Sequence, residues 1–245
     1  MYKKTILLYF FSAISTILFA QEKIVPKKNL VDKKFIHDQQ YKMLWSMVRD
    51  TSKIDIGQVE TNVVVTKKLI TVITKVQMKG AKSSWIDSTV VHRDDLSPLY
   101  HSSRNAQRDM VIRFDDKISG YHLDHQKGKR ISINEKGQQQ YFDSNFYPIL
   151  INWLPLDINK KAVLDIYDFN PNGKIGLLKV HILKVSKGAY TTKRLGIRPV
   201  WIVEVADEIS KNTISTYQFD QLNRQLYKQT ISVGKQQMEM SLIED

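Results

Sequence analysis

Histidine and carboxylate side chains are the residues of this chain that could bind a metal ion or exchange a proton. Among its six histidines the closest pair is His122 and His125, with Asp124 between them. On a strand, alternate side chains point to opposite faces, so His122 and Asp124 share one face and His125 lies on the other. The two imidazoles then cannot bind one ion, and the spacing supplies no third ligand. We therefore expect a solvated hairpin end here and no metal site.

A second pattern, running from Asp168 to Gly173, matches the first half of a calcium-binding loop. The bidentate glutamate that ends such a loop is replaced by Lys179. The sequence Asn-Pro-Asn-Gly between two apolar segments is also a common turn signal. We expect a turn here, without calcium.

Patterns for nucleophilic catalysis are missing from the sequence. It contains no Gly-x-Ser-x-Gly elbow, no Ser-x-x-Lys with partner motifs and no glycine-rich phosphate loop. It also contains no cysteine, which excludes a thiol nucleophile, a disulfide framework and a cysteine-based zinc site. The adjacent carboxylates at 94–95 and 115–116 would face opposite sides of a strand, or water in a turn. We expect no catalytic residue, no cofactor and no enzymatic activity.

The sequence predicts that short β-strands position these residues. From Tyr41 onward, β-branched and aromatic segments alternate with polar, glycine and asparagine clusters. A half-buried strand is predicted by Met110, Ile112 and Phe114, which recur at every second position. Short turns around 115–117 and 126–129 connect it to strands at 118–123 and 131–133, which predicts an antiparallel meander. Further strands are expected at 62–78, 84–92, 162–169, 175–185, 199–206, 213–219, 225–233 and 238–242.

One segment, Phe142 to Leu156, predicts a short helix instead. Asp143 or Ser144 could cap it, Pro148 is tolerated in a first turn, and Pro155 would end it. The segment is apolar on nearly every side, so other elements must cover it. We expect a mainly β fold, in which a single highly curved antiparallel sheet, a half-open barrel, wraps this short helix. The residues predicted to line or cover a ligand cavity are Phe146, Tyr147, Leu150, Trp153 and Leu154, with core filling as the alternative.

The first twenty residues read as an export signal peptide. Lys3 and Lys4 precede the apolar run from Ile6 to Phe19, which ends at Ala20. The run is short for a membrane span, which favours cleavage after Ala20 over an uncleaved anchor. Lipid attachment would need a cysteine at the cleavage site, and none is present. We expect an exported protein, periplasmic or secreted, that is not lipid-anchored.

The chain is basic, with 37 lysines and arginines against 25 acidic residues and a formal net charge of +12. This excess favours contact with anionic surfaces. Nucleic acid is not expected outside the cytoplasm, which leaves acidic lipid headgroups, lipopolysaccharide phosphates or an acidic protein as partners, and a plain solvated surface as the alternative. The densest basic segments are expected in a flexible N-terminal arm, residues 21–34, and in a turn at 127–130. Residues 35–245 are expected to form a single β domain.

The segment from Asp87 to Tyr121, DSTVVHRDDLSPLYHSSRNAQRDMVIRFDDKISGY, together with the helix and Leu154-Pro155-Leu156, resembles a family of exported bacterial β-proteins, a domain of unknown function. That family is similar in fold to the periplasmic lipoprotein carriers LolA and LolB. The resemblance spans most of 41–233 and implies a curved sheet whose concave side, covered by helices, leaves an apolar cavity for acyl chains. The chain lacks the lipid-anchoring cysteine of LolB, and the functional residues of the carriers have no counterpart that can be matched by position. The end of the signal peptide also looks like those common among Bacteroidetes.

Three functions are compatible with these features. The leading hypothesis is a non-enzymatic binding protein that holds a hydrophobic ligand, a lipid or an acyl chain, in the concave face of the sheet. The second is a cell-envelope interaction or structural module with a filled core. The third is an envelope hydrolase, which would require a histidine to face a carboxylate inside a cleft. The histidines considered for this role are His92, His101, His122 and His181.

Overall fold

A computed structural model describes residues 21–50, 52–137 and 140–244; the predicted signal peptide lies outside them. Over the described residues, sixteen β-strands form one sheet around a single short α-helix. The strands before the helix are β1 (Glu22–Ile24), β2 (Gln39–Arg49), β3 (Ser52–Val65), β4 (Leu69–Met78), β5 (Trp85–His92), β6 (Pro98–Arg104), β7 (Arg108–Phe114), β8 (Lys117–Asp124), β9 (Lys129–Lys136) and β10 (Phe142–Asp143). After helix α1 (Tyr147–Trp153) come β11 (Ala162–Phe169), β12 (Ile175–Thr192), β13 (Gly196–Asp207), β14 (Thr213–Asp220), β15 (Leu226–Val233) and β16 (Gln236–Leu242).

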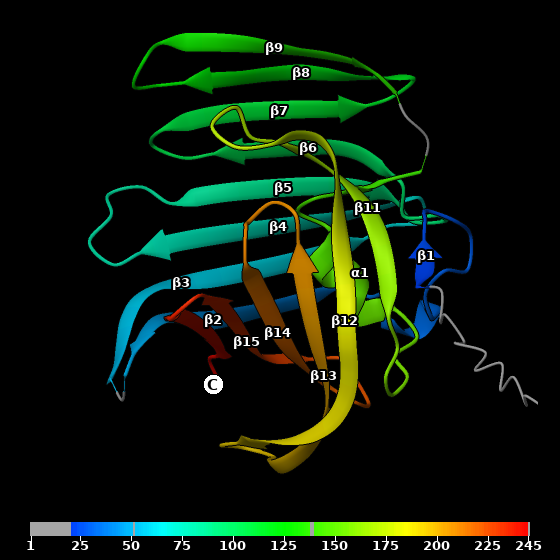
Figure 1. Cartoon of the computed structure of the whole chain (residues 1–245), viewed down its shortest axis with the longest axis vertical. Coiled ribbons are helices and arrows are strands. Elements are labelled where there is room, and N and C mark those ends of the chain that lie inside the picture. The colour runs from blue at the N-terminus through cyan, green and yellow to red at the C-terminus, as the bar shows by residue number, and fades with distance from the viewer. Residues whose placement is uncertain (1–20, 51, 138–139, 245) are drawn as a thin grey trace, which may run out of the picture.

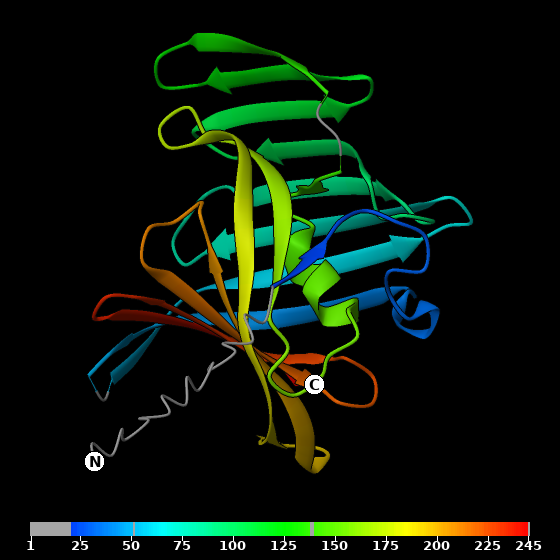
Figure 2. The ribbon, with the colours of Figure 1, turned by 45° about the vertical axis from the view of Figure 1, so that its right-hand side comes forward.

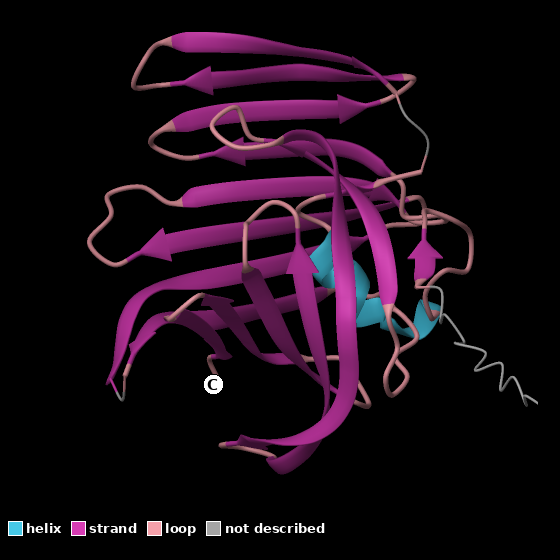
Figure 3. Cartoon of the chain, in the orientation of Figure 1, coloured by secondary structure: helices cyan, strands magenta, loops and turns pink. Residues whose placement is uncertain are grey.

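The sheet is folded over on itself without closing. Its strand order is β1-β11-β12-β13-β14-β15-β16-β2-β3-β4-β5-β6-β7-β8-β9, and β10 pairs with β11 outside this path. Strands β2 to β9 form one wall, while β11 to β15 cross in front of it, and α1 lies between the two layers (Figures 1 and 2). The prediction of a single curved sheet around a short helix is confirmed, as the enclosed helix in Figure 3 shows.

Short turns explain why most of the sheet is antiparallel. The predicted meander is confirmed as β7, β8 and β9, in which each strand pairs with the next. The strand predicted at 62–78 is two strands, because Thr66 makes a turn in which its hydroxyl accepts hydrogen bonds from the backbone N–H groups of Lys68 and Leu69. Strand β12 runs past its predicted end at 185 to Thr192, because its pairing with β13 continues as a long hairpin.

The curvature of the sheet is associated with local irregularities in strand pairing. The register shifts between Trp45 and Ser46 in the β2–β3 pair and between Ile182 and Lys184 in the β12–β13 pair. Such bulges bend a strand and increase its twist, which helps a wide sheet to fold over. The largest group of buried apolar side chains lies inside the fold, around α1. A second group joins β7, β8 and β9 to β11, with the rings of Phe114 and Tyr167 5.7 Å apart.

The N-terminal segment, predicted as a flexible arm, is attached to the sheet along part of its length. Strand β1 pairs in parallel with β11, and Ile24 is buried. Leu30 and Val31 are buried as well, in the same core as the helix. The prediction of a flexible arm is wrong for this part, because three buried apolar residues within the basic segment anchor it, while its lysines stay in solvent.

Candidate functional site

Helix α1 is held in place by its own ends and by the core around it. Pro148 occupies the first turn as predicted, and the helix ends at Trp153, shortly before Pro155. The predicted caps are wrong: Phe146 occupies the N-cap position and makes no side-chain cap bond. Asp143 is bound elsewhere, because its carboxylate accepts hydrogen bonds from the side chains of Thr89 and His101. The start of the helix is thus fixed by tertiary contacts.

A cavity of about 150 Å³ lies between α1 and the concave face of the sheet. The helix contributes Pro148, Ile149 and Asn152, which share one side because their spacing follows the helical period. The sheet contributes apolar side chains and a smaller number of polar ones. These are Tyr41, Met43, Val59, Thr61, Val72, Thr74, Tyr217, Phe219, Leu226, Gln229 and Met240, and Asn145 completes the lining just before the helix.

Asn152 gives this mostly apolar cavity a polar point. Its side chain is only 4% exposed, and its amide nitrogen donates a hydrogen bond of 2.8 Å to the backbone carbonyl of Arg224. Its oxygen Oδ1 is buried and has no hydrogen-bond partner among the described residues. A buried acceptor without a partner costs free energy, so a hydroxyl or N–H group that reached this oxygen from the cavity would make a favourable contact.

Tyr41 lines both this cavity and a larger cleft of about 530 Å³ on the outside. The cleft lies between the tip of the β12–β13 hairpin, the turn after β14 and the end of β16, and Lys42 and Arg194 are among its lining residues. The hairpin tip is tied to the end of the chain, since Glu244 accepts hydrogen bonds from the backbone N–H groups of Lys193 and Arg194. Burial raises the pKa of Tyr41, while a hydrogen bond with Thr61 acts in the opposite direction. Tyr41 is therefore protonated at neutral pH, and it forms part of the wall of both the outer cleft and the inner cavity.

A buried polar cluster lies behind the cavity. His101 Nδ1 lies 2.8 Å from Asp143 Oδ1, and the amide nitrogen of Asn145 lies 3.2 Å from His101 Nε2. Burial lowers the pKa of His101, but the charge of Asp143 and the hydrogen bond to it outweigh that effect and raise the pKa above its ordinary value. Burial also raises the pKa of Asp168, which accepts a hydrogen bond from Ser144.

The hydrolase hypothesis requires a histidine that faces a carboxylate inside a cleft, and the surroundings of His101 can be compared with this requirement. Of the four histidines considered, His101 does face a carboxylate. His101 and Asp143 are 3% and 0% exposed, however, and neither lines a cleft described above. The second ring nitrogen of His101 meets an asparagine amide, where a hydrolase would need a nucleophile or a water molecule. The arrangement can fix the position of Asn145 at the cavity wall, and it offers no route for a substrate to reach the imidazole.

None of the five residues predicted to line or cover a ligand cavity is among the lining residues, and they instead hold in place the helix that covers the cavity. Phe146 packs edge-on against Trp153, with ring centroids 5.9 Å apart, and Leu150 and Leu154 are buried beside them. The hydroxyl of Tyr147 donates a hydrogen bond of 2.9 Å to Asp207, and burial is the main cause that raises its pKa. The residues that sequence reasoning missed are Pro148, Ile149 and Asn152. The signal that could have found them is Asn152, the one polar residue within α1.

The other sequence patterns lie away from the cavity. His122 is buried on β8, whereas His125 follows the strand, exposed, 3.4 Å from Asp109. Asp168 ends up beside Ser144, and Asn170 to Gly173 form the predicted turn. Within the described residues, no group of three or more histidine, aspartate or glutamate side chains is arranged to hold a metal ion. No helix of residues 21–50, 52–137 and 140–244 combines the length and the apolar character that crossing a bilayer requires.

Comparison with known proteins supports the fold and gives no activity. Residues 40–241 match the family described as "Protein of unknown function (DUF3108)". A crystal structure of a β-barrel-like protein of the domain of unknown function DUF1849, from Brucella abortus, is similar with a TM-score of 0.50 at 12% identity. The similarity covers 90% of this chain and 98% of that one, and at this identity it speaks for the fold alone. No curated protein matches the sequence.

Proposed function

We propose that this chain, which belongs to the DUF3108 family, is a non-enzymatic binding protein that holds a hydrophobic ligand, a lipid or an acyl chain, beneath α1. The observation that carries the proposal is the cavity of about 150 Å³ under the helix, which shares Tyr41 as a lining residue with an outer cleft of about 530 Å³. Apolar side chains of the cavity would receive the chain of the ligand, because removing apolar surface from water is favourable. The oxygen of Asn152 would receive one polar group.

The size of the cavity limits what it can hold. Cavities of about 150 Å³ bind molecules as small as benzene, and pockets for larger ligands measure roughly 300–1,000 Å³. The cavity therefore accommodates the end of a hydrocarbon chain, and the rest of the ligand would lie in the outer cleft. An anionic headgroup there would meet Lys42 and Arg194, which agrees with the basic character of the chain.

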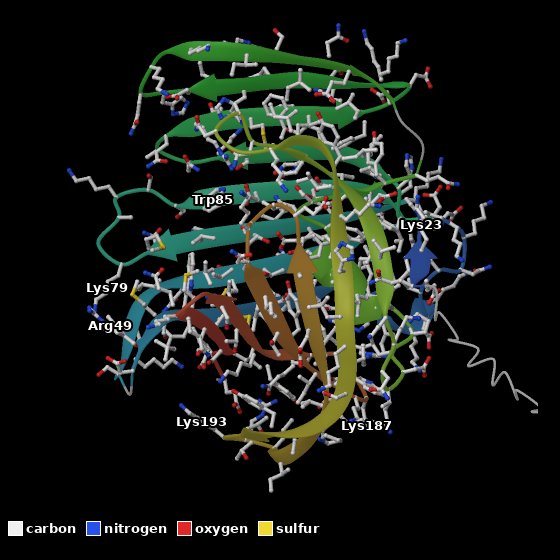
Figure 4. The ribbon with its side chains drawn as sticks, viewed as in Figure 1. Lys23, Arg49, Lys79, Trp85, Lys187 and Lys193 are labelled. Atoms are coloured by element: carbon white, nitrogen blue, oxygen red, sulfur yellow. The ribbon has the colours of Figure 1, made fainter. Side chains whose placement is uncertain are left out.

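The hairpin beside the cleft suggests how the ligand arrives. Ile197, at the tip of the β12–β13 hairpin, is 74% exposed, and Leu195 next to it is exposed as well. Lys187 and Lys193 lie on the same hairpin, which projects from the fold in Figure 4. Apolar side chains flanked by lysines suit a transient contact with an anionic membrane surface. We propose an exported protein of this kind, similar in fold and role to the carriers LolA and LolB but without a lipid anchor.

Two measurements test the proposal. The purified protein is extracted with organic solvent, and the extract is analysed by mass spectrometry for bound lipid. The delipidated protein is then titrated with cis-parinaric acid, a fluorescent fatty acid, and we expect saturable binding near one ligand per chain.

A second candidate function is an interaction or structural module with a filled core. It is favoured by the small size of the cavity compared with ordinary ligand pockets. If the extract contains no lipid and the titration shows no saturable binding, the binding proposal fails and this second function is preferred.

A further inference from the structure

A separate groove of about 530 Å³ lies at the ends of β4, β5, β7 and β8. Trp85, Arg108 and His122 line it from the wall of the sheet, and Asn172 lines it from the turn between β11 and β12. In Figures 1 and 2 this turn crosses in front of β6 and β7. The groove shares no lining residue with the cavity beneath α1 or with its outer cleft.

Trp85 forms an apolar platform in this groove. Its side chain lies at the start of β5, labelled in Figure 4, and is 36% exposed, unusually open for tryptophan. The single indole N–H is shared between the carboxylate of Asp87 at 2.7 Å and the hydroxyl of Ser103 at 3.0 Å. The guanidinium carbon of Arg108 lies 5.7 Å from the ring centre, and Arg108 also donates to Ser103. The ring is thus fixed in orientation by its edge, while part of its apolar surface is left open to the groove.

Four of the side chains that line the groove with Trp85 are amides, and they lie beside small apolar and charged groups. Asn105, Gln107, Gln126 and Asn172 all line the groove, together with Ser84. An amide both donates and accepts hydrogen bonds, so this set matches a ligand covered with hydroxyl groups. Among the charged residues, Asp124 and Lys127 lie 3.9 Å apart and offset each other. Arg108 also lines the groove, so the formal charge of the groove is +1, a small excess that does not by itself select an ionic ligand.

Two buried polar atoms in the wall of the groove have no partner. His122 is 4% exposed, and its Nδ1 forms no hydrogen bond with any described residue; the same is true of Arg108 Nε. Burial, followed by the charge of Arg108, lowers the pKa of His122, so its ring is neutral at pH 7 and one of its nitrogens is an acceptor. Buried polar groups of this kind are normally satisfied, and a bound polar molecule would reach these two atoms only after a small shift of the side chains that cover them.

We propose that this groove binds a carbohydrate. The C–H face of a pyranose ring is apolar and would stack on Trp85, while its hydroxyl groups would bond to the amides, to His122 and to Arg108. An aromatic side chain with one apolar face and a satisfied polar edge suits such a ligand, whose faces are apolar and whose rim is polar. The inference does not depend on a lipid beneath α1, because the two sites share no residue.

The test is a titration of the full protein with soluble oligosaccharides, followed by tryptophan fluorescence and calorimetry. The probes are chito-, cello-, malto-, xylo- and manno-oligosaccharides of three to six units, with AMP as a planar base that could also stack on an indole. We expect saturable binding of at least one oligosaccharide. Binding of AMP alone, or of none of these probes, would overturn the proposal.

Variants locate the binding to the groove. Trp85→Ala should weaken oligosaccharide binding by at least about tenfold, as the loss of a stacking contact does elsewhere. Trp85→Phe should restore part of the affinity, because it keeps an aromatic face. Ile86→Ala is the matched control, since Ile86 is the next residue on β5, points to the opposite face and is 43% exposed.

A further variant protects the test against loss of folding. Gln107→Ala changes an exposed residue in the β6–β7 turn, and it should weaken binding by about threefold through one lost hydrogen bond. Circular dichroism and urea unfolding establish which variants are folded. Unchanged affinity in folded Trp85→Ala, or in both Trp85→Phe and Gln107→Ala, would place the sugar elsewhere and refute the proposal.

Discussion

Replacing Val72 by phenylalanine should fill part of the cavity beneath α1 while keeping the fold. Val72 is buried on β4 and lines the cavity, so the larger side chain enters the space. An unfilled volume of 150 Å³ costs up to ~3.6 kcal/mol at about 24 cal/mol per Å³. A phenyl ring that takes up on the order of a third of this volume should raise the free energy of unfolding by about 1 kcal/mol, less any strain from the fit.

The effect of Val72→Phe on binding should be larger than its effect on stability. A ligand present at about 100 times its Kd stabilises a protein by ~2.7 kcal/mol, and the filled variant should lose most of this, because the end of the hydrocarbon chain no longer fits in the remaining space. The assay is urea unfolding of the delipidated protein with and without cis-parinaric acid, followed by circular dichroism to avoid the ligand fluorescence.

Val72→Ala is the matched control for this prediction. It enlarges the cavity and should lower the free energy of unfolding by about 2 kcal/mol, while the stabilisation by the ligand is kept. A filled variant that the ligand stabilises as much as the wild-type protein would refute the reasoning, because the ligand would then bind outside the cavity.

Three further predictions concern stability. Because the pKa of His101 is raised in the folded state, protonated His101 contributes fully to the free energy of unfolding below about pH 6.5, and this contribution is lost as the pH rises through the pKa of the folded state. His101→Gln should remove this pH dependence from the free energy of unfolding, measured with urea between about pH 5 and 9. Burial raises the pKa of Glu239, but hydrogen bonds from Lys228 and Lys53 outweigh this effect and lower the pKa to about 2. The free energy of unfolding should therefore fall as the pH drops below about 4.5, and that of Glu239→Gln should be less sensitive to acid over the same range. Gly120→Ala should lower the free energy of unfolding by more than about 3 kcal/mol and reduce the thermal midpoint, because the added Cβ would lie 1.9 Å from the carbonyl oxygen of Val111 and φ is +155°. An alanine variant as stable as wild type would contradict the close approach of β7 and β8.

Local sequence signals predicted most of the fold because the sheet is built from neighbouring strands. The turns at 115–117 and 126–129 fix the pairing of β7, β8 and β9. Pro148 lies in the first turn of α1 and Pro155 follows its end, as predicted. The long hairpin of β12 and β13 was predicted too short, because the residues between 186 and 192 carry a mixture of polar and small side chains without an apolar period. Pairing with β13 alone keeps that stretch extended.

The candidate site could be predicted only in outline. Helix α1 is apolar on nearly every side, so its sequence could not say which face packs into the core and which faces a cavity. Asp143 has the local pattern of a helix cap, and only its contacts with Thr89 and His101, 54 and 42 residues away, show its different position. The groove beside Trp85, proposed to bind a carbohydrate, combines residues from five segments of the chain, and nothing in their local sequence links Trp85 with Asn172.

The most direct test of the central proposal is to find where a fatty acid binds. A fatty acid that carries a diazirine near its methyl end is added to the purified, delipidated protein, irradiated, and mapped by mass spectrometry of proteolytic peptides. We predict saturable labelling of the peptides that contain Val72, Ile149 and Met240, which line the cavity on three different elements, and competition by unlabelled fatty acid. Labelling confined to the exposed hairpin tip, or labelling that unlabelled fatty acid does not displace, would contradict a binding site beneath α1.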